Sequence, residues 1–382
     1  MVMIRRAVVL LVILAFLALP AGVAAGSSGG SSLQATLQPL IEAKMKELRV
    51  PGAVVFVQVP GKGTWEAALG IGDLATKAPM RLDDHFQIAS ITKTFTGTVI
   101  LQLVDEGKLR LDDPVATYQP EVPNGANITI RHLLNMTSGL YDYGDDKGFN
   151  KKADAEPGKV WNPKDLLAIA LQHPPYFAPG KGIHYSNTNY ILLGLIIEQI
   201  TGRPVEHVFH DRIFGPLGMT ETSLPPLSSA AIPDPHPRGY MFGTFTELVE
   251  HTPLTAGSPR DVTDMSPSEG WTAGSMISTV HDLKIWAKAL ATGALLSPAA
   301  QQEQLSWTSL ASGPNVPKYG LGIADFGDGF IGHNGAIAGF QSFMVYQPDT
   351  HATVIVLTNL VMAPDGTLPA DTLATIIREH LR

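Results

Sequence analysis

The sequence has no cysteine among its 382 residues. This absence excludes a disulfide-stabilised scaffold, a zinc or iron–sulfur site with cysteine ligands, a thiol nucleophile and a lipid anchor on an N-terminal cysteine. Charged residues are also scarce, at 16% of the chain against ~25% in typical globular proteins. The 27 basic and 35 acidic side chains give a formal net charge of −8, which argues against a nucleic-acid-binding protein because such a protein needs a basic face.

Glycine and proline are abundant instead, with 37 and 29 residues, and together they exceed the ~12% of average usage. This composition predicts many turns and long shaped loops, and it argues against a helical bundle or a coiled coil. Hydrophobic residues make up 45% of the chain, which is enough to build a large core.

The first 25 residues have the features of a secretory signal peptide. Arg5 and Arg6 precede an apolar run over residues 7–19, and Pro20 and a stretch of small residues follow. Cleavage of residues 1–25 predicts an extracytoplasmic protein, either secreted or located in the periplasm or cell envelope, with no stable membrane anchor. The alternative is an uncleaved anchor, which Pro20 disfavours because it interrupts a stretch that is already short for a membrane span.

The rest of the chain predicts strands at both ends and helices between them. Residues 26–32 are all glycine or serine and predict a flexible linker, so the folded part is expected to begin near Leu33. Apolar spacing and turn residues then predict strands at 53–59, 319–326, 339–346 and 352–360, and helices at 33–48, 90–106 (amphipathic), 130–135, 163–172, 187–200, 279–291 and 369–381. This order favours an α+β fold with a helical insertion. Residues 224–260, rich in proline and glycine with a short strand-like piece at 238–245, are too long for a plain connector and suggest a lid or a binding wall.

Ser90 and Lys93 form a Ser-x-x-Lys motif where an extended segment is expected to turn into a helix. The spacing puts both side chains on one face of that helix. A serine hydroxyl becomes nucleophilic when a neighbouring base takes its proton, and a lysine is such a base only if burial or nearby cations keep it neutral. The helix N-terminus adds a backbone N–H aimed at a developing oxyanion. Taken alone, the motif fits an exposed helix start with a solvated lysine better.

A second motif is Tyr185-Ser186-Asn187. If this stretch is extended, Tyr185 and Asn187 point to the same side. A phenol near an ammonium group loses its proton more easily and can relay protons between nucleophile and leaving group. The competing interpretation is a core tyrosine beside an asparagine that caps the following helix, and Asn187 can do both.

A third motif is His333-Asn334-Gly335-Ala336. Glycine at a strand edge lets a substrate backbone lie against the strand, and the N–H of Ala336 is a candidate second oxyanion donor. The competing interpretation is a turn glycine beside a surface histidine. The three motifs in this order have a chance expectation of ~0.04, so together they favour one shared catalytic site.

With these motifs the sequence resembles the penicillin-recognising serine hydrolases, which include low-molecular-weight DD-peptidases, class C β-lactamases and related esterases. Supporting stretches lie at residues 133–140, 266–280 and 319–322. The resemblance implies an antiparallel sheet flanked by the N- and C-terminal helices, with a mostly helical inserted lobe. Residues 33–382 would then be a single catalytic domain in two lobes, a sheet lobe (33–100 plus 260–382) and a helical lobe (101–259).

The resemblance also implies a catalytic role for three residues. Ser90 would be the nucleophile, Lys93 its activator and Tyr185 the general acid/base. The reaction would be acyl transfer through an ester on Ser90, followed by hydrolysis with water and without any metal or organic cofactor.

Four further residues would bind substrate. Asn187 would position it, His333 and Gly335 would occupy the third motif, and the N–H groups of Ala336 and the nucleophile would form the oxyanion hole. Lys318-Tyr319-Gly320 also fits a Lys-x-Gly third motif, but in this family a Tyr-Gly-Leu-Gly strand precedes the third motif, so His333 is the better match.

The third motif also bears on the activity. The β-lactamases of the family usually carry Lys-Thr-Gly there, whereas His-x-Gly resembles a subset of DD-carboxypeptidases and D-amino-acid peptidases. We therefore expect a D-alanyl-D-alanine carboxypeptidase that acts on small peptides, esters or β-lactams, peptidoglycan stem peptides among them. One feature of the sequence argues against a carboxypeptidase. Such an enzyme needs a cation to bind the substrate carboxylate, and no arginine occurs between Arg260 and Arg378. The candidates to replace that cation are His333, Lys284, Lys288 and Lys318.

Other activities stay open. An esterase needs no cation for a carboxylate, and a class C-like β-lactamase would use the same site. A non-catalytic penicillin-binding protein on the same fold is the alternative outside the enzymes. The Gly-x-Ser-x-Gly elbow of the α/β-hydrolases is absent, and His207, His210 and Asp211 have no further ligand at a telling spacing, which disfavours a metal site.

Overall fold

The computed structural model describes residues 29–249, 254, 257–309 and 318–381. The expected signal peptide lies outside these residues. At the centre is a nine-stranded antiparallel sheet with the order β3-β2-β1-β13-β12-β11-β10-β9-β8. The first and last long strands are therefore neighbours in the middle of the sheet, with Val55 opposite Val356.

The strands are β1 (Gly52–Val59), β2 (Gly63–Asp73), β3 (Ala78–Pro79), β4 (Phe86–Gln87), β5 (Tyr240–Met241), β6 (Arg260–Asp261), β7 (Ile277–Ser278), β8 (Thr308–Ser309), β9 (Lys318–Tyr319), β10 (Ala324–Asp325), β11 (Ile331–Ile337), β12 (Phe340–Gln347) and β13 (Ala352–Thr358). The α-helices are α1 (Gly29–Leu48), α2 (Thr92–Asp105), α3 (Ile130–Leu134), α4 (Lys147–Ala155), α5 (Pro163–Ala170), α6 (Asn187–Thr201), α7 (Val205–Phe209), α8 (Gly215–Leu217), α9 (Phe245–Val249), α10 (Trp271–Gly274), α11 (Val280–Thr292), α12 (Pro298–Gln304) and α13 (Pro369–Leu381). Short helical turns are η1 (Ala89–Ile91), η2 (Val115–Thr117), η3 (Tyr143–Asp145), η4 (His210–Phe214) and η5 (Pro267–Glu269).

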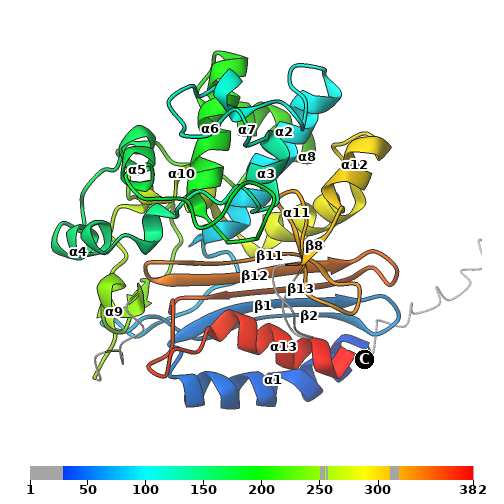
Figure 1. Cartoon of the computed structure of the whole chain (residues 1–382). Helices are drawn as coiled ribbons and strands as arrows, with labels where there is room; N and C mark the ends of the chain where they lie inside the picture. The colour runs from blue at the N-terminus through cyan, green and yellow to red at the C-terminus, as the bar shows by residue number, and fades with distance from the viewer. Residues whose placement is uncertain (1–28, 250–253, 255–256, 310–317, 382) are drawn as a thin grey trace, which may run out of the picture.

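The central strands are buried on both faces, which makes the protein a three-layer structure (Figure 1). In β1, Val55 packs on the side of α1 and α13, while the alternate residues Val54 and Phe56 pack on the side of the other helices. β13 divides its side chains in the same way, because side chains alternate along a strand. A run of valine and isoleucine therefore serves two hydrophobic cores at once.

The outer layer consists of α1 and α13. Apolar residues of α1 at helical spacing, from Leu37 to Leu48, are buried against the sheet. The helix begins at Gly29 and not near Leu33, so the last four residues of the expected linker form its first turn. Because the packing of its buried face already holds the helix, adding one more turn costs only the small free energy that reflects the low helix propensity of glycine and serine.

The layer on the other face of the sheet contains most of the remaining helices, with α2 in their midst, while α9 lies beside the sheet (Figure 1). We expected α2 to be amphipathic, but almost all of its residues are buried. Its threonine hydroxyls are hydrogen-bonded, within the helix where Thr98 donates to the Thr94 carbonyl and outside it where Thr96 donates to the Thr272 carbonyl. The lobe boundary expected at residue 100 falls inside α2, and α11 and α12 also lie in this layer although we assigned them to the sheet lobe. No helix in the described part of the chain is long and apolar enough to cross a membrane.

The sheet differs from the sequence-based prediction in two places, a strand that was missed and a strand that is divided. β2 is absent from the sequence-based prediction, because its glycines and a glutamate weaken the strand pattern, and its pairing with β1 compensates. Residues 319–326 form two short strands and not one, because Gly322 has a positive φ of +79° and reverses the chain.

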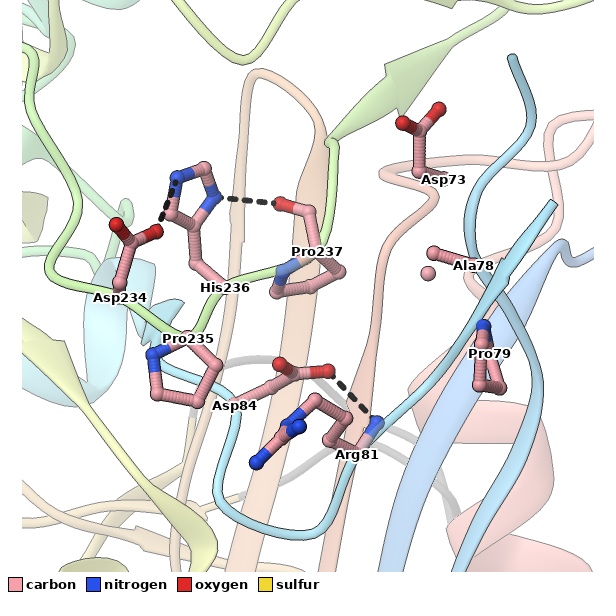
Figure 2. Close-up of a pocket in the computed structure, with 10 residues that line it drawn as sticks. Asp73, Ala78, Pro79, Arg81, Asp84, Asp234, Pro235, His236 and Pro237 are labelled. Carbon is pink, nitrogen blue, oxygen red and sulfur yellow. Dashed lines mark hydrogen bonds and ion pairs between the residues drawn. The ribbon is translucent and has the colours of Figure 1, made fainter. Parts of the chain in front are cut away.

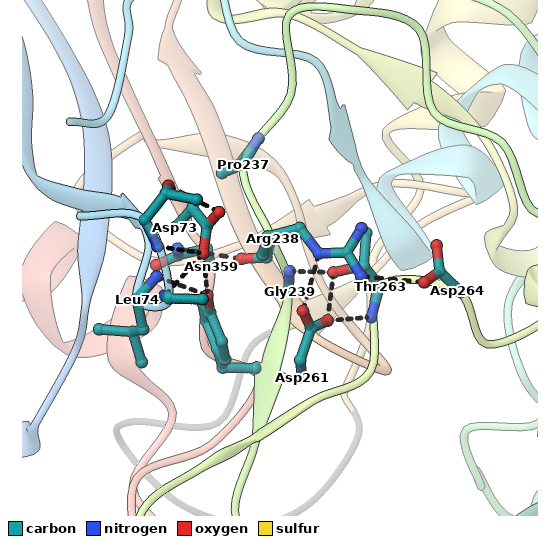
Figure 3. A network of polar contacts seen from close by, with 12 residues as sticks. Asp73, Leu74, Pro237, Arg238, Gly239, Asp261, Thr263, Asp264 and Asn359 are labelled. Atoms are coloured by element: carbon teal, nitrogen blue, oxygen red, sulfur yellow. Dashed lines mark hydrogen bonds and ion pairs between the residues drawn. The ribbon is translucent and has the colours of Figure 1, made fainter. Parts of the chain in front are cut away.

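The described residues of the 224–260 segment contact the sheet at β5, where Tyr240 forms a bridge with Leu360. The strand expected at 238–245 is limited to β5, because Asp154 accepts hydrogen bonds from the N–H groups of Phe245 and Thr246 and so starts α9. Figure 3 shows how the segment is held at Arg238, whose N–H donates to Gly72 and whose carbonyl accepts from Asn359. The described part of the expected binding wall is thus tied to β2 and β13.

Candidate active site

Ser90 lies on a strained turn between β4 and α2. Ala89, directly before it, has a positive φ of +48°, which is unusual for a residue with a side chain. Ala89 and Ile91 are buried, whereas Ser90 is partly exposed. The turn therefore fixes the backbone in the core and presents the hydroxyl at the surface of the site.

Lys93 is fully buried, and its amine has three partners. Its Nζ lies 3.0 Å from Ser90 Oγ, 2.7 Å from Asn187 Oδ1 and 2.8 Å from the carbonyl oxygen of Ala273. No carboxylate of the described residues bonds directly to it. Burial lowers the pKa of Lys93 from its usual 10.5 to about 7, with Asp142 acting in the opposite direction.

The geometry around Lys93 suits a neutral amine. A neutral amine has two N–H donors and one lone pair, and the two carbonyl-type oxygens, Asn187 Oδ1 and Ala273 O, can only accept. The lone pair is then left for the hydroxyl of Ser90, which can donate. The arrangement can therefore take a proton from Ser90 without moving Lys93.

Tyr185 lies beside the same pair. Lys93 Nζ is 4.8 Å from the centre of its ring. The structure contradicts our expectation that the phenol loses its proton more easily here, because burial raises the pKa of Tyr185, and a hydrogen bond with Ser90 offsets this only in part. Tyr185 is a neutral phenol that can pass a proton on.

Asn187 opens α6 but does not cap it. The N-cap residue is Ser186, and no side-chain capping bond is made there. Asn187 uses both ends of its amide elsewhere, accepting from Lys93 and donating through Nδ2 to Asp142 Oδ2 at 3.0 Å. The capping interpretation is wrong, and Asn187 belongs to the Lys93 cluster.

His333 lies on β11, is only 2% exposed and uses both ring nitrogens. Nδ1 donates to the carbonyl of Asn334 at 2.5 Å, so Nε2 accepts from the hydroxyl of Tyr319 at 2.9 Å. Burial and the neighbouring Lys93 lower the pKa of His333 to about 3. His333 is therefore neither a surface histidine nor a cation for a substrate carboxylate.

Gly335 and Ala336 bring β11 against the nucleophile. A Cβ added to Gly335 would lie 2.5 Å from the backbone nitrogen of Ser90, so only glycine fits there. Ala336 is exposed, and beyond Gly332 no described strand pairs with the outer edge of β11. That edge can receive an extended substrate backbone.

Sequence reasoning missed three contributors to the cluster. They are the buried carboxylate of Asp142, the hydroxyl of Tyr319 and the carbonyl of Ala273. Ala273 and Tyr319 lie within the stretches 266–280 and 319–322 that the resemblance marked, whereas Asp142 lies just outside the stretch 133–140. No spacing rule indicates that a backbone carbonyl or a distant carboxylate reaches Lys93.

The charged groups next to this cluster are mostly acidic. Asp145 accepts from Tyr176, whose hydroxyl in turn accepts from the N–H of Asp142. Burial raises the pKa of Glu269 to about 7, and its carbonyl accepts from Tyr143. The three lysines proposed for a substrate carboxylate are not in the cluster: Lys284 lies over the ring of Phe56 and Lys318 is an exposed residue of β9 near Asp325, while Lys288 is exposed on α11.

Comparison with known proteins now decides the family. The family model described as "Beta-lactamase" matches residues 37–375. The chain belongs to the β-lactamase family. It is a serine hydrolase of that family, with the β-lactamase/transpeptidase-like fold.

The proteins similar to this β-lactamase-family chain include an amidohydrolase and a penicillin-binding protein. The crystal structure of a D-stereospecific amidohydrolase from Streptomyces sp. is 32% identical, with a TM-score of 0.77, covering 91% of this chain and 97% of that one. Penicillin-binding protein 4* of Bacillus subtilis (strain 168) is 29% identical over 331 residues, covering 85% of this chain and 71% of the relative. Protein flp of Staphylococcus aureus (strain N315) is 29% identical over 86% of this chain, and the match spans 63% of its length.

A separate cavity of about 450 Å³ lies at the edge of the sheet, away from the cluster (Figure 2). Its lining includes Asp84, Arg81 and His236 but none of the motif residues of this β-lactamase-family hydrolase. Among the described residues, no three histidine, aspartate or glutamate side chains are grouped so as to hold a metal ion.

Proposed function

We propose that the protein cleaves peptide or amide bonds next to D-amino acids through an acyl-enzyme on Ser90. The observation that carries this proposal is the 3.0 Å contact between Ser90 Oγ and a buried Lys93 whose other two partners are obligate acceptors. Similarity to a D-stereospecific amidohydrolase and to penicillin-binding protein 4* supports the D-configured substrate.

The residues would act in sequence. Lys93 takes the proton of Ser90 as its Oγ attacks the substrate carbonyl carbon, and the N–H groups of Ser90 and Ala336 stabilise the oxyanion. Tyr185 passes that proton to the leaving amine as the C–N bond breaks, which leaves an ester on Ser90. Water then attacks the ester. Its proton passes through the same groups to Ser90 Oγ as the ester C–O bond breaks, which releases the acid.

A D-alanyl-D-alanine carboxypeptidase is the form of this activity that the His-x-Gly motif favours. The substrates would be small peptides, peptidoglycan stem peptides among them. A second candidate is a D-aminoacyl amidase or aminopeptidase, whose substrate carries a free ammonium group and no carboxylate. The neutral His333 and the carboxylate of Asp145 favour this second candidate, because such surroundings suit a substrate ammonium group better than a carboxylate.

Covalent labelling separates these activities from the other members of the family. The wild-type protein and Ser90→Ala are treated with a fluorescent penicillin and a fluorophosphonate, then assayed with D-Ala-D-Ala peptides, D-aminoacyl amides, nitrocefin and p-nitrophenyl esters. We expect labelling of the wild type alone and turnover of a D-configured peptide or amide. No labelling by either probe would contradict the role of Ser90, and labelling without any turnover would indicate a penicillin-binding protein that does not hydrolyse. Turnover of esters or nitrocefin alone would indicate an esterase or a β-lactamase.

We further propose that residues 1–25 are removed on export, which would place the enzyme outside the cytoplasm beside peptidoglycan. Arg5 and Arg6 with the apolar run after them support this location. N-terminal sequencing of the protein recovered from the cell envelope or medium tests it. An intact Met1 in the membrane fraction would indicate an anchor.

A further inference from the structure

Asp142 is a buried carboxylate, only 5% exposed, that the proposed mechanism does not use. Its two oxygens have different partners. Oδ1 accepts from the N–H of Gly144 at 3.0 Å, and Oδ2 accepts from Nδ2 of Asn187 at 3.0 Å. A buried carboxylate is costly in free energy unless it is bonded in this way, so its presence beside the catalytic cluster calls for a reason.

The loop that carries Asp142 is fixed to the start of α6. Thr188 Oγ1 accepts from the N–H of Tyr143 at 3.2 Å and donates to the carbonyl of Tyr141 at 2.8 Å. One side chain thus holds the backbone on both sides of Asp142. The carboxylate and the amide of Asn187 therefore keep a fixed relation to each other.

The contact decides which end of the Asn187 amide faces Lys93. With Nδ2 bonded to Asp142, Oδ1 faces Lys93 Nζ at 2.7 Å. A flipped amide would set N–H donors against the amine and an oxygen against the carboxylate, so both contacts would be lost. In the orientation seen, Asn187 uses one N–H of a neutral Lys93 and leaves the lone pair for Ser90.

Asp142 also acts on Lys93 through its charge. A carboxylate near an amine favours the ammonium form, opposite to the effect of burial. The other titratable groups that face Lys93 are Tyr185, Tyr190 and His333, and all three are neutral. Those around the carboxylate are Lys93 itself, Asp145 and the phenols of Tyr141, Tyr143, Tyr176 and Tyr185.

We propose that Asp142 is a positioning residue, which holds the Asn187 amide in its working orientation and sets the pH at which Lys93 becomes a base. The proposal rests on the proposed roles of Ser90 and Lys93. It assigns to Asp142 an effect on the pH profile that a merely structural residue would not have.

Asp142→Asn tests the proposal, because it keeps an oxygen that can accept from Asn187 and removes the charge. The readout is the rate of Ser90 labelling by a fluorophosphonate between pH 5 and 10. We expect the acid limb of the profile to move to lower pH by on the order of one unit, because Lys93 loses the charge that favours its ammonium form. An acid limb at the wild-type pH would overturn the proposal.

Asp282→Asn is the matched control. Asp282 is also 5% exposed and also accepts from a backbone N–H, that of Glu221 at 2.9 Å, but it has no contact with the catalytic cluster. We expect a comparable loss of thermal stability and an unmoved acid limb. The same shift in both variants would overturn the proposal, since it would then follow from destabilisation.

A second variant keeps the proposal testable if Asp142→Asn does not fold. In the double variant Asp142→Asn/Asn187→Asp the charge stays in the cluster but moves next to Lys93. The acid limb should then move to higher pH, and an unmoved limb would count against the proposal. Failure of the wild type to label at any pH would contradict the proposed function itself and is thus distinguishable from a failure of this inference.

Discussion

The polar network around Lys93 and the one around Arg238 both join distant segments, but they treat a positive charge in opposite ways. Arg238 is 31% exposed in its side chain and binds two carboxylates, Asp261 at 2.7 Å and Asp264 at 2.9 Å (Figure 3). Lys93 is fully buried and bonds to no carboxylate in the described part of the chain. The first network keeps its cation charged, since the carboxylates raise the pKa of Arg238, whereas burial lowers that of Lys93 to about 7.

This difference separates a structural cation from a catalytic base. The guanidinium of Arg238 binds Asp261 and Asp264 and so ties residues 237–241 to the segment that contains β6, and its charge never changes under ordinary conditions. Lys93 changes its charge near neutrality because counter-ions are kept at a distance, with Asp142 reaching it only through Asn187. The fold therefore does more than place a lysine at this position. It also keeps the neighbouring carboxylate out of direct contact with the amine, so that the pKa of Lys93 stays low.

Replacing each cation by the other basic residue should give the largest difference between the two networks. Lys93→Arg places a group at the site that cannot lose its proton, so we expect Ser90 labelling and turnover to fall by ~10²–10⁴-fold. Arg238→Lys should leave the rate per folded molecule within about twofold, because ion pairs at partly exposed sites contribute ~0–1 kcal/mol. Circular dichroism gives the folded fraction for both. Equal losses of activity would contradict the distinction.

Gly335→Ala tests whether close backbone approach matters at the catalytic network. The added Cβ would lie 2.5 Å from the nitrogen of Ser90, and we expect kcat/KM to fall about 10- to 100-fold as the turn shifts. Gly158→Ala is the control, since its Cβ would meet nothing within 4 Å and its φ is not positive. A fully active Gly335→Ala enzyme would show that β11 does not constrain Ser90.

Asn359→Ala should affect the network around Arg238 and not the chemistry. Asn359 is fully buried, accepts from Gly52 N–H and donates to the carbonyls of Gly72 and Arg238. Its loss leaves several buried backbone groups unpaired, so we expect the free energy of unfolding to fall by ~2–4 kcal/mol with kcat of the folded enzyme unchanged. Denaturant unfolding measures the loss, and Asn127→Ala, an exposed asparagine, serves as the control. A large drop in kcat would link the two networks.

Asp264→Ala is expected to have the smallest effect. Asp264 is 84% exposed in its side chain, although it binds Arg238 at 2.9 Å. We expect a change in unfolding free energy below ~0.5 kcal/mol, because an exposed ion pair gains little over solvation. A loss comparable to that of Asn359→Ala would mean that the pair is more shielded than its exposure indicates.

The sequence predicts the fold best where a local pattern and the final packing agree. The continuous apolar runs of β1 and β13 and the apolar spacing in α1 are such cases. β2 was missed because pairing with β1, and not its own residues, makes it a strand. The buried character of α2 was missed because helices from elsewhere in the chain cover a face that reads as polar.

Packing between distant segments also limits what the sequence predicts about the site. Ser90, Lys93, Tyr185 and Asn187 lie in short motifs whose spacing carries chemical meaning, and the structure brings them together. Asp142 reaches Lys93 only through a loop packed on α6, and its residue type alone does not mark it as buried. The protonation states of Tyr185 and His333 were expected wrongly for a related reason, since burial outweighs the neighbouring groups and is not visible in a motif.

The proposed mechanism requires that Lys93 is a neutral amine near physiological pH. Its most direct test is NMR of protein labelled with ¹³Cε-lysine, titrated from pH 5 to 11, with Lys93→Met to assign the signal. We expect one lysine signal that titrates near pH 7 and is missing from the variant, while the others titrate near pH ~10.4. A Lys93 signal that titrates above pH 10 with the rest would contradict it.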